Sequence, residues 1–356
     1  MILRRKSRIV RIGKVKIGAG FPIAIQSMAK TETANVEDTV KQIKELESAG
    51  CPIVRLAVKD EEDAHALKKI RAESKAALVA DIHFNWRLAI KAIESGVDKI
   101  RLNPGNIYKP QEVEKVAQAA KTHHIPIRVG VNSGSLRNSV PGARCQVSGV
   151  DKMVKSALDY IRMLEKFGFR DIVISLKASN ALDTIEAYSK IAGVCDYPLH
   201  LGVTATGPAY SGMIKSSIAI GALLLGGIGD TIRVSLTDAP LAEVKAAKSI
   251  LEALELQRFG PQIVSCPTCG RCEVDLVKIV NNLENRLSTI DYRLSTRSYK
   301  IAVMGCVVNG PGEAKEADLG IAFGKKEGLL FKNGKALRKL DMKHCTDDIL
   351  KEIRKI

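Results

Sequence analysis

The sequence predicts an α/β fold in which a (β/α)8 TIM barrel is followed by a small α+β domain. Up to about residue 255, short β-branched runs alternate with amphipathic helical segments, and there are eight of each. This alternation favours a closed barrel over an open doubly wound sheet. Several of the short runs are almost continuously apolar, which is typical of parallel strands that are covered on both faces.

The predicted strands and helices follow one another through the whole barrel region. Asn35 and Asp60 precede the first two predicted helices and can cap them, and Gly50 ends the first of these helices. The other six helices are expected at residues 86–95, 111–122, 150–167, 181–192, 211–225 and 241–255. The eight strands are expected at residues 23–28, 53–58, 78–82, 99–102, 127–131, 171–176, 199–203 and 231–236.

The pattern changes near residue 260, where a Gly-Pro pair predicts a domain boundary. Residues 1–258 are expected to form the barrel that binds substrate, and residues 259–356 the second domain. In that domain, Asn333-Gly334 predicts a hairpin with a type I′ turn. The other elements are expected to be a helix at 274–287, a strand at 300–304, a glycine-rich loop at 305–312, a strand at 319–323 and a helix at 346–355.

The chain carries a formal net charge of +16, which admits three kinds of partner: nucleic acid, an anionic small molecule or an acidic protein. Aromatic residues make up only 4% of the chain and no nucleic-acid-binding motif is present, so nucleic acid is not expected. No run of about 18 apolar residues predicts a membrane helix. The basic start lacks the apolar core of a secretory signal, so a cytoplasmic location is expected.

The carboxyl ends of the predicted strands carry many cations, at the place where a (β/α)8 barrel has its active site. Ion pairing inside the barrel, with Asp81 as a partner, would account for any single arginine. Five cations with amide and hydroxyl donors better suit an anionic substrate, and guanidinium groups can bind a diphosphate through two donors at once. The predicted substrate-binding residues are Arg55, Asp81, Arg101, Asn103, Arg128, Asn132, Ser135, Lys177, Thr204, Arg233 and Ser235.

The second domain holds a cysteine pattern that is typical of a metal centre. Cys266 and Cys269 form a C-x2-C pair, and Cys306 supplies a third thiol beside a Gly-Pro-Gly loop that ends at Glu313. Zinc usually takes four closed ligands from two such pairs, whereas an iron–sulfur cluster needs four ligands that are commonly thiolates. The spacing favours iron–sulfur over zinc or no metal, and the fourth ligand is open between Cys272 and Glu313.

At this point the sequence resembles the bacterial 4-hydroxy-3-methylbut-2-enyl diphosphate synthases, known as the IspG or GcpE family. The resemblance spans nearly the whole chain, and its matches come in the same order as in the family. The matching segments are residues 26–28, 50–55, 80–84, 101–106, 128–135, 229–236, 266–271 and 304–313.

The resemblance implies a fold, a cofactor and a reaction. It implies that a domain like those of sulfite and nitrite reductases carries a [4Fe–4S] cluster held by Cys266, Cys269, Cys306 and Glu313. The implied reaction is the two-electron reductive ring opening and dehydration of 2-C-methyl-D-erythritol 2,4-cyclodiphosphate, in the non-mevalonate (MEP) route to isoprenoids. Reduced ferredoxin or flavodoxin would supply the electrons. The family forms a homodimer in which the cluster domain of one subunit closes over the barrel mouth of the other.

One departure from the family concerns proton delivery. The family usually has a glutamate after strand seven, where this chain has Ala205, which cannot carry a proton. Water, the neighbouring threonines or another acid would have to take over, and Glu243 is a possible but unplaced substitute. His83 lies near a strand end and is either a structural donor or a catalyst. The predicted catalytic residues are Glu313, Glu243, Thr204 and His83.

A second hypothesis assigns the chain to a different class of enzyme. In this alternative, the barrel is a non-redox, phosphate-binding transferase and zinc stabilises the C-terminal domain. The two hypotheses differ in the metal they require, because only the first needs iron and electron transfer.

Overall fold

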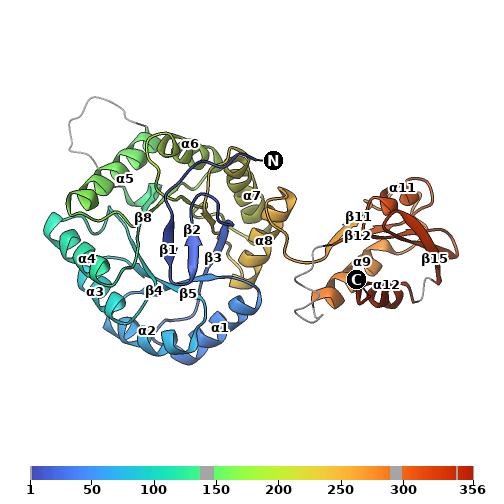
Figure 1. Cartoon of the computed structure of the whole chain (residues 1–356), viewed down its shortest axis with the longest axis horizontal. Coiled ribbons are helices and arrows are strands. Elements are labelled where there is room, and N and C mark those ends of the chain that lie inside the picture. Colours follow the sequence, from blue (N-terminus) through green and yellow to red (C-terminus); the bar gives the residue numbers. More distant parts are fainter. Residues whose placement is uncertain (1, 137–147, 289–298, 342–343, 356) are drawn as a thin grey trace. The chain divides into compact units, whose positions relative to one another are not determined.

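The structure is a computed structural model that describes residues 2–136, 148–288, 299–341 and 344–355 (Figure 1). The chain forms two compact units, Met1–Gln257 and Arg258–Ile356. The first unit is a (β/α)8 barrel and the second is a small domain with a five-stranded sheet, so the predicted fold class is confirmed.

The barrel is a parallel sheet of eight strands in the order β8-β7-β6-β5-β4-β3-β10-β9. A parallel bridge between Ile174 and Leu199 joins β8 to the residue before β9, and this contact closes the ring. The strands are β3 (Ala24–Met28), β4 (Ile53–Val58), β5 (Ala77–Ile82), β6 (Lys99–Leu102), β7 (Ile127–Asn132), β8 (Ile172–Lys177), β9 (His200–Leu201) and β10 (Thr231–Ile232).

Helices surround the strands, as Figure 1 shows, and the described residues of this unit form eight of them. The side chains of Asn35 and Asp60 accept hydrogen bonds from backbone N–H groups in the first turns of their helices, as their positions in the sequence predict. The helices are α1 (Val36–Ser48), α2 (Glu61–Glu73), α3 (Trp86–Glu94), α4 (Pro110–Thr122), α5 (Gly149–Lys166), α6 (Ala181–Ala192), α7 (Ala209–Leu225) and α8 (Pro240–Ala253).

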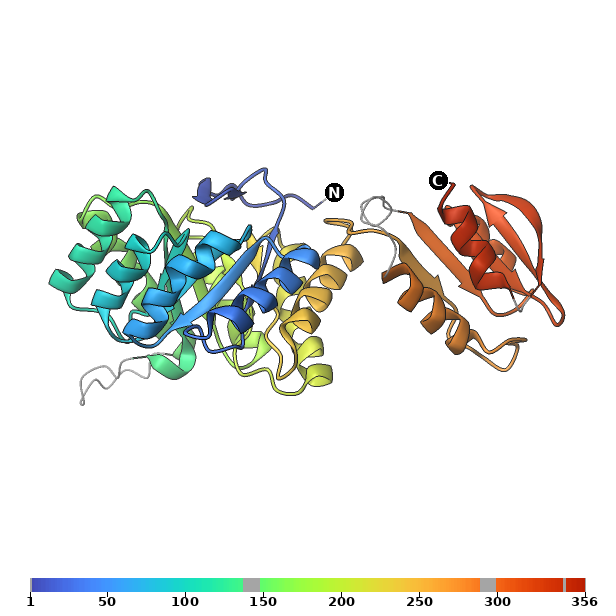
Figure 2. The same cartoon turned by 90° about the horizontal axis from the view of Figure 1, so that it is seen from below.

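An antiparallel hairpin that the sequence did not predict covers the amino-terminal end of the barrel (Figure 2). It consists of β1 (Val10–Ile12) and β2 (Val15–Ile17), and its apolar side chains pack against residues near the starts of β3, β4, β5 and β8. Strands of three residues leave too short an alternation to detect from the sequence. The hairpin seals the end of the barrel that lies opposite the strands' carboxyl ends.

The last two barrel strands are shorter than predicted. Each keeps two ladder residues, although the sequence predicted strands at 199–203 and 231–236. Beyond them the chain continues as an irregular segment whose residues Thr204 and Ser235 line a cavity. Apolar character continued past the point where the ladder stops, so the periodicity placed the strand ends too late. Strand β8, by contrast, ends later than predicted, because Lys177 is its last residue and does not follow it.

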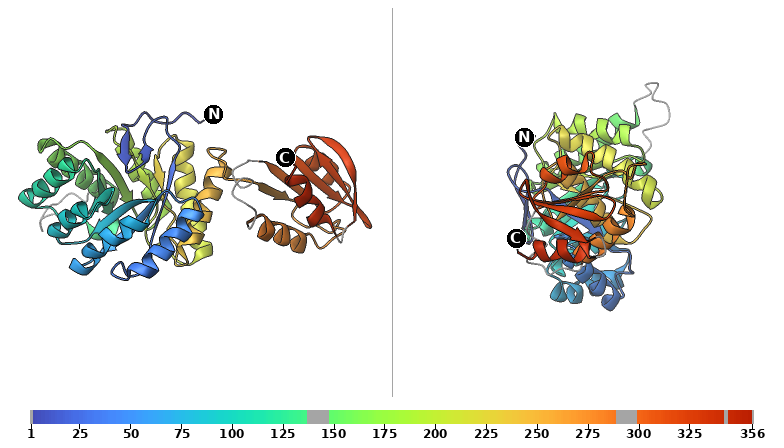
Figure 3. Two further views of the ribbon diagram at one scale, coloured as in Figure 1. Left: turned by 60° about the horizontal axis from the view of Figure 1, so that its bottom comes forward. Right: turned by 90° about the vertical axis from the view of Figure 1, so that its right-hand side faces the viewer.

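The second unit is built on a sheet in the order β11-β12-β13-β14-β15, with β11, β12 and β13 parallel (Figure 3). Helices α9 and α12 cover one face with an apolar core, and α11 covers the other. The elements are β11 (Gln262–Ser265), α9 (Leu276–Ser288), β12 (Lys300–Met304), α11 (Gly310–Lys315), β13 (Leu319–Phe323), β14 (Glu327–Lys332), β15 (Lys335–Asp341) and α12 (Cys345–Ile353).

Three details of this unit bear on the predictions. Asn333 and Gly334 both have positive φ values, 49° and 78°, so the type I′ hairpin is confirmed. Strand β11 was missed. The segment predicted as a loop at 305–312 gives way to helix α11 at Gly310, which places Glu313 on a helix rather than at the end of a loop. In the parts of the chain that the structure describes, no helix is long and apolar enough to cross a membrane.

Candidate active site

A cavity of about 390 Å³ opens at the carboxyl ends of the barrel strands. Every residue that the sequence assigned to substrate binding lines this cavity, and so do His83 and Thr204; their binding and catalytic roles stay predictions. Four further lining residues were not singled out from the sequence: Met28, Asn106, Ser175 and Val203. Ser175 could have been found, because it lies two residues before Lys177 and side chains alternate along a strand.

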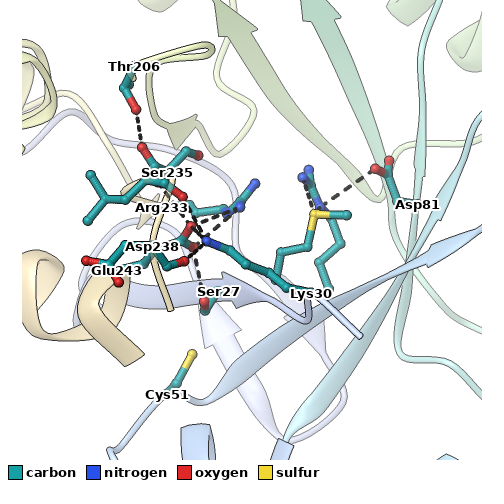
Figure 4. A network of polar contacts seen from close by, with 12 residues as sticks. Ser27, Lys30, Cys51, Asp81, Thr206, Arg233, Ser235, Asp238 and Glu243 are labelled. Atoms are coloured by element: carbon teal, nitrogen blue, oxygen red, sulfur yellow. Dashed lines mark hydrogen bonds and ion pairs between the residues drawn. The ribbon is translucent and has the colours of Figure 1, made fainter. Parts of the chain in front are cut away.

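The strand register brings the charged residues of the cavity side by side. Asp81 of β5 pairs in register with Arg101 of β6, which in turn pairs with Arg128 of β7. Asp81 forms ion pairs with Arg101 at 3.2 Å and with Arg55 at 3.8 Å, and a dashed line from Asp81 in Figure 4 marks the second of these. Burial alone would raise the pKa of Asp81, but Arg55, Arg101 and Arg128 outweigh it and hold that pKa below its usual range.

Arg55 has a second, unusual partner. Its guanidinium Nε and Nη2 donate to the sulfur of Met28 at 3.1 and 2.7 Å. A thioether sulfur is a weak acceptor. Burial and the neighbouring Arg233 and Arg101 lower the pKa of Arg55 to about 10, although Asp81 opposes this. Arg55 therefore remains a cation whose donors are held by weak contacts, which a stronger anionic acceptor would displace.

Two cations of the cavity have no acid partner among the described residues. Arg128 is 1% exposed and Lys177 is 6% exposed, and no described carboxylate forms an ion pair with either. Burial lowers the pKa of both groups well below the usual values, and the surrounding arginines lower them further. Burying a charge without a partner is costly, so this arrangement is expected only where an anion completes it.

Several guanidinium nitrogens of cavity-lining residues are buried and have no hydrogen-bond acceptor in the part of the chain that the structure describes. They are Nε of Arg101, Nε and Nη1 of Arg128 and Nε of Arg233. More than nine in ten buried polar groups are paired in native proteins, so a cluster of unpaired donors requires an explanation. All of these donors belong to residues that line one cavity, and an anion with several oxygens would satisfy them together.

Two loops at the mouth are fixed by Asn103. Its side-chain NH2 donates to the Ser135 hydroxyl at 2.9 Å, and its side-chain oxygen accepts from the Gly105 backbone N–H at 3.0 Å. A Cβ at Gly105 would lie 2.0 Å from the Ser135 carbonyl oxygen, so only glycine fits there. Asn103 thus joins the segment after β6 to the short 3-10 turn Ser133–Ser135 after β7.

The candidates for proton transfer are placed differently from one another. His83 is partly exposed at the mouth, with Nε2 3.9 Å from Asp81. Thr204 is fixed by its backbone N–H, which donates to Ala178 at 3.0 Å. Ala205 is exposed and has a φ of 51°. His200 does not line the cavity: it is fully buried, its Nδ1 lies 2.8 Å from the Thr231 hydroxyl, and burial lowers its pKa well below the usual value.

Glu243 is not among the described residues that line the cavity. It lies behind Arg233, at 3.3 Å from Nη2, on the first turn of α8 (Figure 4). Its carboxylate also contacts Lys30 at 3.2 Å, the Ser27 hydroxyl at 3.2 Å and the Leu236 backbone N–H at 3.1 Å. The structure therefore does not bring Glu243 to the place where a proton would be delivered to a bound molecule.

In the second unit, two of the predicted metal ligands follow neighbouring parallel strands. Cys266 comes directly after β11 and Cys306 comes two residues after β12. The Gly305 backbone N–H donates to the Cys266 sulfur at 3.3 Å. Backbone N–H groups of Val308, Asn309 and Gly310 lower the pKa of Cys306. Sulfur atoms that receive backbone N–H groups are suited to be thiolate ligands of an iron–sulfur cluster.

The remaining candidate ligands differ in exposure and in their surroundings, and only the sulfur of Cys272 lies close to Gly305, as the sulfur of Cys266 does. Cys269 is exposed, and hydrogen bonds from Arg271 lower its pKa. Glu313 is exposed on α11. Cys272 is half-buried, its thiol lies 3.2 Å from the Val274 carbonyl oxygen, and it packs against the apolar core of this unit. Within the described residues, no three His, Cys, Asp or Glu side chains come together closely enough to hold a metal ion.

The donor set nevertheless fits an iron–sulfur cluster. Three cysteines of the C-x2-C…C pattern lie on segments that follow two adjacent strands, and two of their sulfurs receive backbone N–H groups. No histidine belongs to the group of candidate ligands. The arrangement can supply three thiolates, with the fourth ligand coming from Glu313 or Cys272.

Comparisons with known proteins define the class of this chain. The family model described as "GcpE TIM-barrel domain" matches residues 7–248, and the one described as "GcpE protein C-terminal domain" matches residues 262–355. The chain therefore belongs to the GcpE family.

Relatives with established names narrow this further. The chain is 52% identical, over 99% of its length and 98% of the relative's, to "4-hydroxy-3-methylbut-2-en-1-yl diphosphate synthase (flavodoxin)" of Caldanaerobacter subterraneus subsp. tengcongensis. It is 50% identical, over the same shares of both chains, to the protein of that name from Fusobacterium nucleatum.

Solved structures of low identity share the fold of the barrel. The dihydropteroate synthase of Stenotrophomonas maltophilia matches with a TM-score of 0.52 and 14% identity, over 70% of this chain and 98% of that one. The dihydropteroate synthase of Yersinia pestis matches with a TM-score of 0.51 and 12% identity, over 70% of this chain and 99% of that one. At such identities the likeness concerns the TIM-barrel fold alone.

Proposed function

We propose that this chain converts 2-C-methyl-D-erythritol 2,4-cyclodiphosphate to 4-hydroxy-3-methylbut-2-enyl diphosphate. The reaction consumes two electrons and two protons, opens the ring at a carbon–oxygen bond and releases one water. The single observation that carries the proposal is the set of unpaired buried guanidinium donors on the cavity of the barrel. Membership of the GcpE family supports the same reaction and gives no support to the zinc-stabilised transferase.

The cavity binds the diphosphate through its cations. Among the described residues, no carboxylate forms an ion pair with Arg128 or Lys177, so both would pair with phosphate oxygens. The Nε groups of Arg101 and Arg233, which have no acceptor there, would add directed hydrogen bonds. Arg55 can turn from the Met28 sulfur to a phosphate because the thioether is the weaker acceptor. Asp81 stays ionised among these cations and holds Arg101 and Arg55 in place.

A [4Fe–4S] cluster is the cofactor that fits the second unit. Cys266, Cys269 and Cys306 would hold it with three thiolates, and Glu313 would be the fourth ligand. When bound, the cluster supplies electrons one at a time. A carboxylate is a harder and weaker ligand for iron than a thiolate is, so Glu313 would be the most easily exchanged of the four.

Proton delivery has to differ from the pattern that the family resemblance implies. Ala205 offers no proton, and Glu243 lies behind Arg233. Thr204 and His83 are the described candidates that line the cavity, and His83 is exposed enough to exchange protons with water. We therefore assign proton delivery to water held at the mouth by His83 and Thr204.

Two partners complete the proposal. Reduced flavodoxin is the proposed electron donor, because the printed names of the relatives specify it, and reduced ferredoxin is the alternative. A homodimer is proposed as the working assembly, and light scattering of the purified protein would test it.

Anaerobic turnover of the cyclic diphosphate with a chemical reductant tests the function. We expect a brown protein with broad absorbance near roughly 400 nm, as iron–sulfur proteins have. This protein should form 4-hydroxy-3-methylbut-2-enyl diphosphate and water. The Ala205→Glu variant, which restores the family's acid, is expected to turn over at least as fast. If neither protein turns over while both hold an intact cluster, the function is wrong. Stoichiometric zinc in a colourless protein after anaerobic reconstitution with iron and sulfide would favour the transferase.

A further inference from the structure

We propose that Glu243 is a positioning residue, which aims the Arg233 guanidinium into the cavity and delivers no proton. The inference rests on the proposed function only in that it takes the cavity to bind a diphosphate. It replaces the role in proton delivery that the sequence suggested for Glu243. The contacts that carry it are drawn in Figure 4.

Glu243 is 1% exposed, and its carboxylate accepts from four different groups. Arg233 donates Nη2 to both carboxylate oxygens, at 3.3 and 3.5 Å. The Lys30 ammonium, the Leu236 backbone N–H and the Ser27 hydroxyl supply the other three donors. A guanidinium, an ammonium and a backbone N–H can only donate. Both carboxylate oxygens of Glu243 are therefore already engaged by donors on its own side of Arg233.

The contact with Glu243 fixes the direction in which Arg233 can act. A guanidinium is planar, so holding Nη2 on one side determines where the other N–H groups point. Arg233 is 9% exposed and lines the cavity, and its Nε is buried with no acceptor. Glu243 thus holds one nitrogen of a guanidinium whose side chain lines the cavity, while Nε has no acceptor among the described residues and could bind a phosphate.

The position of Glu243 is itself fixed by Lys30. The Lys30 ammonium donates to the Leu236 carbonyl at 2.7 Å and also to the Asp238 carbonyl. These contacts join the loop that follows β3 to the loop that leads from β10 into α8. Because Glu243 is on the first turn of α8, the backbone, the carboxylate and the guanidinium form one connected unit. Such support is what holds a binding group in a productive geometry.

Binding of inorganic pyrophosphate to the full-length, cluster-loaded protein tests this role, with titration calorimetry as the measurement. Glu243→Gln removes a negative charge next to the cavity, so electrostatics alone would make pyrophosphate bind more tightly. Positioning makes the opposite prediction, and we expect the Kd to rise about tenfold. Glu243→Asp keeps the charge and should recover part of the loss.

Asp63→Asn is the matched control. Asp63 is also a fully buried carboxylate, but it accepts from the backbone N–H groups of Ala34 and Lys59, both at 2.9 Å, and does not line the cavity. We expect its variant to lower the thermal midpoint without changing the Kd for pyrophosphate. A loss of binding in Glu243→Gln that merely followed lower stability would appear in this control as well.

A double-mutant cycle with Arg233→Met gives the decisive comparison. If Glu243 acts through Arg233, adding Glu243→Gln to Arg233→Met weakens binding no further, and the double variant leaves no unpaired guanidinium that could prevent folding. Equal or tighter binding by Glu243→Gln, or full additivity in the cycle, would overturn the inference. If the native protein itself does not bind pyrophosphate, the proposed function fails instead.

Discussion

Arg128 shows most clearly that a single residue of this protein can lower stability while contributing to substrate binding. It is 1% exposed in the barrel, without an acid partner among the described residues, and two of its nitrogens lack any acceptor. Replacing a buried charge with an apolar side chain of similar volume is often stabilising, whereas leaving the charge unpaired costs free energy. The chain keeps this cation at the point where a diphosphate is proposed to bind.

Arg128→Met should therefore stabilise the protein and abolish its function. We expect the free energy of unfolding to rise by about 1–3 kcal/mol in urea denaturation, because the removed charge is buried, has no ion pair among the described residues and is offset only by the nearby Asp81. The KM for the cyclic diphosphate should rise at least about a hundredfold, since a charged hydrogen-bond partner of the phosphate is lost.

Lys99→Met is the comparison for that variant. Lys99 is fully buried in the barrel, with its ammonium 3.4 Å from the Gln26 side-chain oxygen, but it does not line the cavity. It should show a similar gain in stability with an unchanged KM. If Arg128→Met proves less stable than the native protein, the view that this charge is uncompensated is contradicted.

Asp81 makes a contribution to the stability of the barrel that depends on pH. Its folded-state pKa is depressed by Arg55, Arg101, Arg128 and His83, against the effect of burial, from a usual value of 3.8. As the pH falls below that value, the unfolded chain takes up a proton before the folded one, so the contribution of Asp81 is complete above it and is lost below it. In urea denaturation of the cluster-free protein, the stability difference between native and Asp81→Asn should be constant from pH 7 to 5 and shrink below about pH 4. A difference that does not vary with pH would contradict this.

At the scale of elements, the two ends of the barrel have separate tasks. The carboxyl ends of the strands carry the polar cavity, and the β1–β2 hairpin closes the amino-terminal end with apolar side chains. Ile12 is fully buried in this plug. The packing of the β1–β2 hairpin therefore contributes to stability, and the hairpin makes no direct contact with the cavity.

Ile12→Ala should cost stability and leave catalysis unchanged. Truncating a buried isoleucine costs about 2–5 kcal/mol, depending on how far the cavity left behind collapses. We expect a lower thermal midpoint with the same kcat and KM at a temperature where the variant is folded. A changed KM would mean that the two ends of the barrel are coupled.

The segments around the cysteines offer two possible fourth ligands, and their settings differ. Glu313 is exposed on α11, whose first residue, Gly310, donates to Cys306, whereas Cys272 is half-buried and packs against the apolar core, as Cys266 also does. We expect Glu313→Ala to weaken cluster retention after anaerobic reconstitution, measured as iron and sulfide per chain, and Cys272→Ser to retain a full cluster. The reverse result would make Cys272 the ligand and remove the exchangeable carboxylate.

At the scale of the whole molecule, the charge of +16 concerns encounter with a partner more than folding. An acidic electron donor such as a flavodoxin would be attracted electrostatically to a basic protein, and added salt would screen this attraction. The rate of reduction by flavodoxin should fall steeply between about 0.05 and 0.3 M salt, while reduction by a small neutral donor should change little. Equal salt dependence for both donors would show that net charge does not steer the encounter.

Much of the architecture could be read from the sequence because it depends on local patterns. Asn35 and Asp60 cap helices through contacts within one turn, and Asn333-Gly334 forms its turn from the conformations of two residues. The strand-end cations were found because every parallel strand of a barrel ends on the same side. The short hairpin was missed because its packing partners lie far away in the chain.

The sequence by itself determined the barrel, the gathering of cations at its mouth and the cysteine pattern of the second domain, since these follow from periodicity and residue type. Only the tertiary structure decided which cations have partners. The register of β5, β6 and β7 pairs Asp81 with Arg101, and no carboxylate of the described residues forms an ion pair with Arg128. The approach of α8 places Glu243 against Arg233. Partnership of buried charges depends on strands and helices that are distant in sequence, and no local pattern records it.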